Sequence, residues 1–152
     1  MMKEGDPIPA VKVTLPDGSE RSLAEYAMPL VVYFYPKDDT SGCTNEAKDF
    51  SAAMADFAAA GVEVLGISKD PPAKHAKFTA KYELTVPLAT DADDRVCEAF
   101  GTWVEKSMYG KKYMGIERAT FLFGKDGKLA RVWRKVKVPG HVAEVLEVAK
   151  TL

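Results

Sequence analysis

The chain has 152 residues, of which 47% are apolar, and its 21 basic side chains are nearly balanced by 22 acidic ones, which gives a net charge of −1. That apolar fraction is enough for a hydrophobic core, and it excludes a disulfide-stapled miniprotein or a disordered tail. The balanced charge provides no general attraction to nucleic acid, and no stretch approaches the ~20 consecutive apolar residues that span a bilayer. We therefore expect a soluble protein that binds neither nucleic acid nor membrane.

The amino-terminal residues and the cysteine content both favour the cytoplasm. Residues 1–7 contain an acid, a glycine and a proline where a secretory signal needs an unbroken apolar segment. Cys43 and Cys97 form neither a disulfide framework nor a CxxC pair, and they are too few for a structural zinc site. We expect free thiols and no bound metal. His75 and His141 are isolated in the sequence and are interpreted as surface residues.

No repeat or linker divides the chain, which predicts one domain over residues 1–152. The first 29 residues are expected to form an extended lead-in with a turn at residues 16–18. The unbroken apolar run at 30–35 is rich in β-branched and aromatic side chains and is typical of a strand covered on both faces of a sheet.

A helix is predicted after a polar loop, with apolar residues three or four positions apart and Gly61 at its end. The elements expected after it are a strand at 62–67, a helix opened by residues 71–72, a short strand near 86–88, a short helix at about 93–100 with residues 91–94 as its cap, a loop at 101–115, a hairpin of 119–123 with 129–133, and a helix at 140–152. Parallel crossovers followed by a hairpin and a final helix are typical of an α/β, thioredoxin-like fold. We expect a central mixed sheet flanked by helices, with an amino-terminal extension.

Cys43 is expected in the first turn of the helix that follows the central strand, within the segment YPKDDTSGCTNE at 35–46. A thiol is a poor nucleophile until it ionises, and free cysteine has a pKa of about 8.5. The unpaired amides and the dipole at a helix N-terminus favour the thiolate. Thr40 or Ser41 can cap the helix and leave a hydroxyl beside the sulfur, while Pro36 stiffens the approach. The polar neighbours argue against an inert, buried cysteine, although Thr40 alone would be interpreted as a simple cap.

The P-x-x-x-T-x-x-C spacing of Pro36, Thr40 and Cys43 after an apolar strand resembles the active-site motif of the peroxiredoxins. The fuller pattern FYPKDDTxGCTxEA at 34–47 is similar to the bacterioferritin-comigratory-protein, or PrxQ, group of that family. The similarity continues through residues 96–103, 105–111 and 115–122, so it covers nearly the whole chain.

The resemblance implies an antioxidant thiol peroxidase that reduces hydrogen peroxide and organic hydroperoxides without metal, flavin or haem. Cys43 would attack the peroxide and become a sulfenic acid, and Thr40 would hydrogen-bond the sulfur and the peroxide. Arg118, at the start of a predicted strand, would supply a permanent positive charge. The supporting or substrate-binding residues that the resemblance implies are Pro36, Gly42, Glu46 and Trp103.

The position of a second, resolving thiol is where the chain departs from this family. Many similar proteins carry it five positions after the peroxidatic cysteine, where this chain has Lys48, and others carry it in the next helix, which here has no cysteine. Cys97 is the remaining internal candidate, and we interpret it as a buried packing residue.

We therefore predict a one-cysteine mechanism in which thioredoxin, glutaredoxin or glutathione supplies the thiol that attacks oxidised Cys43. The alternatives are a two-cysteine enzyme with Cys97 as the resolving thiol, and a non-catalytic thioredoxin-fold binding module. We expect a monomer, because no extra apolar element is evident for an obligate interface. Residues 106–112, which mix lysines with Tyr109, are interpreted as a loop near the active site.

Overall fold

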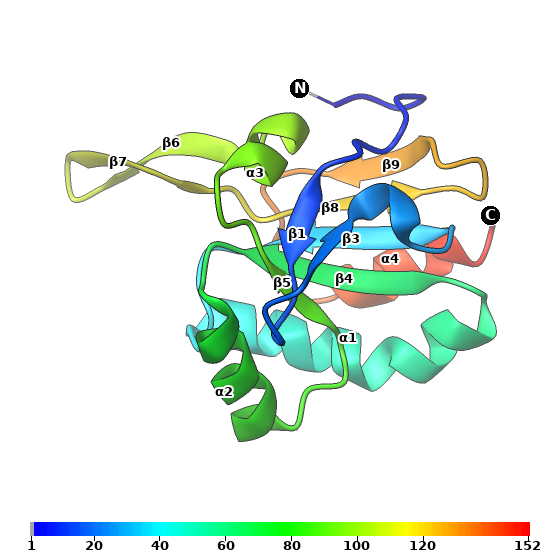
Figure 1. Cartoon of the computed structure of the whole chain (residues 1–152), viewed down its shortest axis with the longest axis horizontal. Coiled ribbons are helices and arrows are strands. Elements are labelled where there is room, and N and C mark those ends of the chain that lie inside the picture. Colours follow the sequence, from blue (N-terminus) through cyan, green and yellow to red (C-terminus); the bar gives the residue numbers. More distant parts are fainter. Residues whose placement is uncertain (1) are drawn as a thin grey trace.

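The computed structural model describes residues 2–152, and its elements follow the expected order with hairpins added in two places. In chain order they are β1 (Lys12–Thr14), β2 (Glu20–Ser22), a 3₁₀ turn (Leu23–Glu25), β3 (Leu30–Phe34), α1 (Ser41–Ala59), β4 (Glu63–Ser68), α2 (Pro72–Tyr82), β5 (Leu88–Thr90), α3 (Arg95–Phe100), β6 (Trp103–Met108), β7 (Lys111–Ile116), β8 (Ala119–Phe123), β9 (Leu129–Trp133) and α4 (His141–Ala149). Figure 1 shows the sheet with α1 and α4 together on one side and α3 on the other.

Strand β3 lies in the interior of a mixed sheet whose strand order is β2-β1-β5-β4-β3-β8-β9, next to the middle strand β4. It pairs in parallel with β4 and antiparallel with β8, and all five of its residues are buried. This confirms the predicted strand covered on both faces of the sheet and the thioredoxin-like arrangement of a mixed sheet flanked by helices, although the middle strand is β4. The β3 register brings the carboxyl end of the strand beside Ala119, where β8 begins.

Alternate side chains of β3 enter hydrophobic clusters on opposite faces of the sheet. The cluster that we call the α1 core includes Tyr33 and Phe50, whose stacked ring centroids lie 4.3 Å apart. The cluster on the other face, the α3 core, includes Phe34 and Phe100, whose ring centroids are 4.9 Å apart. Because the sheet lies between these clusters, residues of α1 and α3 are separated by a layer of paired backbone.

Helix α1 begins immediately before Cys43, as the sequence predicts, and its buried face includes Ala47, Phe50 and Phe57. After its last residues the chain turns at Gly61, which has a φ of +75°. Glycine adopts this left-handed conformation without the steric cost that a side chain would bring. The helix therefore ends where the chain must reverse to enter β4.

The prediction of a loop over residues 101–115 is wrong, because β6 and β7 form an antiparallel hairpin there. The hairpin projects away from the main sheet in Figure 1. Most of its side chains are exposed or half-buried, so the segment lacks the hydrophobic alternation by which a strand is recognised. It turns at Tyr109 and Gly110, which both have positive φ. The lead-in likewise contains the β1–β2 hairpin, which the sequence interpretation missed.

The prediction that His75 and His141 are surface residues is also wrong, since their exposed fractions are 0% and 5%. His141 Nε2 lies 2.8 Å from Thr120 Oγ1, and His75 Nδ1 lies 2.6 Å from Asp38 Oδ2. These partners lie 21 and 37 positions away along the chain, so no local pattern reveals them. Within residues 2–152 no helix is long and apolar enough to cross a membrane.

Candidate active site

Cys43 lies in the first turn of α1, where the first backbone hydrogen bond runs from the Thr44 amide to the Thr40 carbonyl. The amides that precede Thr44 in the helix face its open N-terminal end, which favours a negative charge. The residue is only 1% exposed and belongs to the α1 core. The expectation that polar neighbours keep this thiol out of a buried site is therefore wrong. Apolar side chains cover Cys43 on one side, and a charged side chain reaches it on another.

That charged side chain is Arg118, which lies between β7 and β8. Its Nη2 atom is 3.2 Å from Cys43 Sγ, and its Nη1 atom donates to Glu46 Oε1 at 2.7 Å. Burial works against the charged guanidinium, but Glu46 and Cys43 raise the pKa of Arg118 above its ordinary value. The planar guanidinium thus contacts two side chains of α1 at once, which an ammonium group does with much poorer geometry.

Glu46 is three positions after Cys43 on α1, so the two side chains share one face of the helix. The residue has no exposed surface. Burial raises the pKa of Glu46 to about 7, against the attraction of Arg118. Its Oε1 atom binds Arg118, while Oε2 has no hydrogen-bond partner in the part of the chain that the structure describes. Glu46 therefore fixes the position of the guanidinium without itself contacting solvent.

Gly42 leaves the space that Arg118 occupies. A Cβ atom at this position would lie 3.2 Å from Arg118 Nη2, which is closer than ordinary van der Waals contact. A larger residue would push the guanidinium away from the neighbouring Cys43 sulfur. The absence of a side chain at Gly42 therefore leaves room for the contact between Arg118 and Cys43, and a supporting role of Gly42 stays a prediction.

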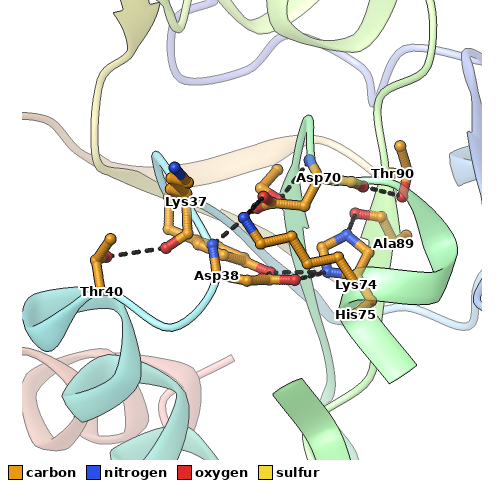
Figure 2. A network of polar contacts seen from close by, with 10 residues as sticks. Lys37, Asp38, Thr40, Asp70, Lys74, His75, Ala89 and Thr90 are labelled. Carbon is orange, nitrogen blue, oxygen red and sulfur yellow. Dashed lines mark hydrogen bonds and ion pairs between the residues drawn. The ribbon is translucent and has the colours of Figure 1, made fainter. Parts of the chain in front are cut away.

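Thr40 occupies the N-cap position of α1, but its side chain does not cap the helix. Its hydroxyl donates to the Lys37 carbonyl at 2.9 Å, as Figure 2 shows. Of the two residues expected to cap the helix, Thr40 does not do so with its side chain, because no backbone amide of the first turn donates to its Oγ1 atom. The lone pairs of Thr40 Oγ1 are left to accept a hydrogen bond.

Pro36 and Trp103 lie in different parts of the structure. Pro36 follows Tyr35 at the end of β3 and begins the loop that leads to Thr40. Trp103 opens β6 and packs against the α3 core, with Lys69 Nζ 4.8 Å from its ring centroid. The structure thus places Pro36 next to the Cys43 loop and Trp103 on the side of the sheet where Cys97 lies.

Cys97 is completely buried in α3 and belongs to the α3 core. Burial, together with the nearby carboxylate of Asp91, raises the pKa of the Cys97 thiol to about 12. The same carboxylate accepts hydrogen bonds from the Val96 and Cys97 amides at 3.3 and 2.9 Å, as expected for a cap in this segment. The thiol is protonated at neutral pH and lies across the sheet from Cys43.

Sequence reasoning missed the polar residues that support the loop before Cys43. Asp38 and His75 are buried and lie 2.6 Å apart, although the sequence interpretation assigned neither of them a role. Asp38 lies inside the motif that carries the resemblance, so its position was a usable signal. His75 gave no such signal, because its partner comes from a distant segment.

A thioredoxin-like sheet with a thiol in the first turn of α1 and an arginine within hydrogen-bond distance of the sulfur has the organisation of a peroxiredoxin. Comparison with known proteins agrees: residues 5–132 match the model of the AhpC/TSA family, and the chain belongs to that family. The described residues contain no cluster of three or more acidic, histidine or cysteine side chains that could hold a metal ion.

Relatives within this family point to the PrxQ group. Peroxiredoxin Bcp of Xanthomonas campestris is 45% identical, over 94% of this chain and 92% of its own. A structure of the bacterioferritin comigratory protein of Xanthomonas campestris, described for its alkyl peroxide reduction activity, superposes with a TM-score of 0.89 at 42% identity and covers 98% of both chains. A mutant of PrxQ from Xylella fastidiosa gives a TM-score of 0.92 at 38% identity, with 99% of this chain and 97% of that one covered. The resemblance to the PrxQ group of peroxiredoxins, which are thiol peroxidases, is confirmed.

Proposed function

We propose that this protein reduces hydrogen peroxide and organic hydroperoxides through Cys43, by a one-cysteine mechanism. The observation that carries the proposal is the 3.2 Å contact between Arg118 Nη2 and Cys43 Sγ in the first turn of α1. A guanidinium beside a thiol at a helix N-terminus favours the nucleophilic thiolate. The alkyl peroxide reduction described for the Xanthomonas relative supports organic hydroperoxides as substrates.

The first step oxidises Cys43 and reduces the peroxide. The thiolate attacks the terminal peroxide oxygen, a sulfur–oxygen bond forms, and the oxygen–oxygen bond breaks. Cys43 becomes a sulfenic acid, and the departing oxygen takes a proton and leaves as water or an alcohol. The Arg118 guanidinium and the Cys43 amide stabilise the negative charge that passes from sulfur to the leaving oxygen. Thr40, whose hydrogen is donated to Lys37, accepts a hydrogen bond from the peroxide.

The second step returns Cys43 to the thiol at the expense of an external reductant. A thiolate of the reductant attacks the sulfenic sulfur, which releases water and leaves a mixed disulfide. A second thiol then displaces Cys43 and completes a disulfide within or between reductant molecules. The burial of Cys97, its protonated thiol and its place across the sheet support external rather than internal resolution.

Thioredoxin, glutaredoxin and glutathione are the reductants that we propose, for a monomeric enzyme of the cytoplasm. The test is steady-state peroxide consumption with each donor, compared between the wild type and Cys43→Ser. We expect donor-dependent turnover in the wild type and none in the variant. Wild-type Cys43 that reacts with peroxide no faster than free cysteine would contradict the proposal and favour a binding module. Roles for Pro36 and Trp103 in supporting the site stay predictions.

A further inference from the structure

A buried polar cluster joins the loop before Cys43 to α2 and to the ends of β4 and β5 (Figure 2). His75 projects from α2, and its Nδ1 atom lies 2.6 Å from Asp38 Oδ2. The other carboxylate oxygen of Asp38 accepts a hydrogen bond from the Tyr35 hydroxyl at 2.5 Å. His75 Nε2 lies 3.0 Å from the Ala89 carbonyl. The exposed fractions of Asp38 and His75 are 2% and 0%, so this pair is sealed from solvent.

The hydrogen bonds define where the protons of this pair lie. A carbonyl oxygen only accepts, so His75 Nε2 carries a hydrogen and donates it to Ala89. One further proton lies between His75 Nδ1 and Asp38 Oδ2. Each polar atom of the two side chains thus has a partner, which fixes the orientation of both. Loss of either side chain leaves the other with an unsatisfied buried group.

The backbone of Asp38 is held as firmly as its side chain. Its amide donates to Asp70 Oδ2 at 2.8 Å. Asp70 is in turn fixed by the Ser68 hydroxyl at 2.7 Å and by Lys74 at 3.1 Å. The next residue, Asp39, is also tied to α2, through Lys81 at 2.8 Å. The loop before Cys43 is therefore anchored to α2 at consecutive residues.

A single peptide plane transmits this anchoring to Thr40. The Asp38 amide and the Lys37 carbonyl belong to the same planar unit and point in opposite directions. On one side of the plane the amide binds Asp70, and on the other side the carbonyl accepts the Thr40 hydroxyl at 2.9 Å. An amide plane held by Asp38 and its partners thus determines where the Thr40 hydrogen points.

We propose that Asp38, clamped by His75 and Asp70, is a positioning residue that orients Thr40 to accept a hydrogen bond from the peroxide. The inference rests on the proposed peroxidase function and extends it to residues that do not contact the sulfur. Without the Asp38–His75 contact the 37–38 peptide is held through Asp70 alone, and the carbonyl that accepts the Thr40 hydroxyl is fixed less firmly. Peroxide activation then falls, while the thiolate beside Arg118 keeps its own reactivity.

The test compares two reactions of Cys43 in each variant: oxidation by hydrogen peroxide and alkylation by iodoacetamide, which needs the thiolate but not Thr40. Asp38→Ala and His75→Leu are expected to lower the oxidation rate by about 10- to 100-fold while alkylation changes little. Asp38→Asn is expected to retain most of the rate, because its amide nitrogen can donate to a neutral His75 Nδ1 and its oxygen can accept from Tyr35.

A double-mutant cycle shows whether the effect passes through Thr40. Thr40→Val is expected to lower oxidation to a similar degree, and adding Asp38→Ala or His75→Leu to it should cause little further loss. The matched control is Ser51→Ala, which removes the side-chain hydrogen bonds to the Thr85 and Val86 amides without touching the Cys43 loop. This control should leave the ratio of oxidation to alkylation unchanged.

Three results would overturn the proposal: parallel losses of oxidation and alkylation, losses that add fully to those of Thr40→Val, or an Asp38→Asn protein that is as slow as the alanine variant. If Asp38→Ala does not fold, the ratio of oxidation to alkylation in His75→Leu and in Asp38→Asn provides the same test of the proposal. Failure of the underlying peroxidase function is a separate result, because it would appear as a slow reaction of wild-type Cys43 with peroxide.

Discussion

The guanidinium of Arg118 reaches the sulfur of Cys43 from a segment 75 positions further along the chain, with 3.2 Å between Nη2 and Sγ. The antiparallel pairing of β8 with β3 makes this possible, because Ala119 lies opposite Phe34, shortly before the Cys43 loop. The Arg118 side chain is 17% exposed, so the charge acts where water screens it weakly. The contact therefore links the topology of the sheet directly to the reactivity of the thiol.

Arg118→Met is expected to lower the rate of Cys43 oxidation by hydrogen peroxide by about 100-fold or more, since a fixed positive charge is lost where negative charge moves. The oxidation rate of Arg118→Lys should lie between the rates of Arg118→Met and the wild type, because a single ammonium group bridges Cys43 and Glu46 poorly. Stopped-flow oxidation of the reduced protein measures both. The control is Arg131→Met, which removes a surface pair with Glu144 and should leave the rate unchanged. An unaltered rate in Arg118→Met would show that the guanidinium is a bystander.

Removal of the second thiol tests how Cys43 is resolved. Cys97→Ala should keep steady-state turnover with an external thiol donor within about twofold of the wild type, since the buried Cys97 does not act as a nucleophile in the proposed mechanism. The variant should be somewhat less stable, because it leaves a small cavity in the α3 core. Peroxide consumption and urea unfolding measure the two effects separately. Near-complete loss of turnover in a folded Cys97→Ala protein would favour the two-cysteine alternative.

The parts of the structure that were predictable are those whose signal is local. The apolar run of β3, the position of Cys43 in the first turn of α1 and the turn at Gly61 after that helix are periodic or adjacent features. Hairpin β6–β7 was not predicted from the sequence, because its exposed strands carry no hydrophobic alternation. The family resemblance names both Glu46 and Arg118 but not their contact, because tertiary pairing across 72 positions brings the two side chains together.

Gly66 in β4 is required by the packing of a neighbouring ring. A Cβ atom there would lie 2.6 Å from Tyr33 Cζ, and Tyr33 is a fully buried residue that cannot move aside. Gly66→Ala is therefore expected to lower the free energy of unfolding by about 2–3 kcal/mol. The matched strand variant, Gly115→Ala, meets the flexible Lys106 side chain at 3.4 Å and should change stability little. Chemical denaturation of both proteins provides the comparison, and equal stabilities would refute the steric explanation.

Protonation of His141 is expected to make the fold less stable in acid. Burial lowers the pKa of His141 to about 4, below the value near 6.5 that the unfolded chain has. The unfolded state therefore binds more protons than the folded state between these values, so the contribution of His141 to stability falls as the pH drops through this window. From about pH 7 to about pH 5 the loss is about 2 kcal/mol.

Comparison with His141→Gln isolates this contribution, because the other titrating groups, including Glu46, are common to both proteins. Glutamine can keep a hydrogen bond to Thr120 but does not titrate. Urea unfolding across this pH range should show a steeper loss of stability on acidification in the wild type than in the variant. Parallel pH profiles would mean that His141 titrates alike in the folded and unfolded chains.

The central claim, oxidation of Cys43 without an internal partner, is tested most directly by mass spectrometry. Fully reduced protein is treated with one equivalent of hydrogen peroxide and quenched quickly. Its intact mass is then measured, and peptide mapping locates the modified residue. The account predicts the gain of one oxygen on Cys43, with Cys97 unmodified. An unchanged mass would contradict the peroxidase function, and the loss of two hydrogens with a Cys43–Cys97 crosslink would contradict the one-cysteine mechanism.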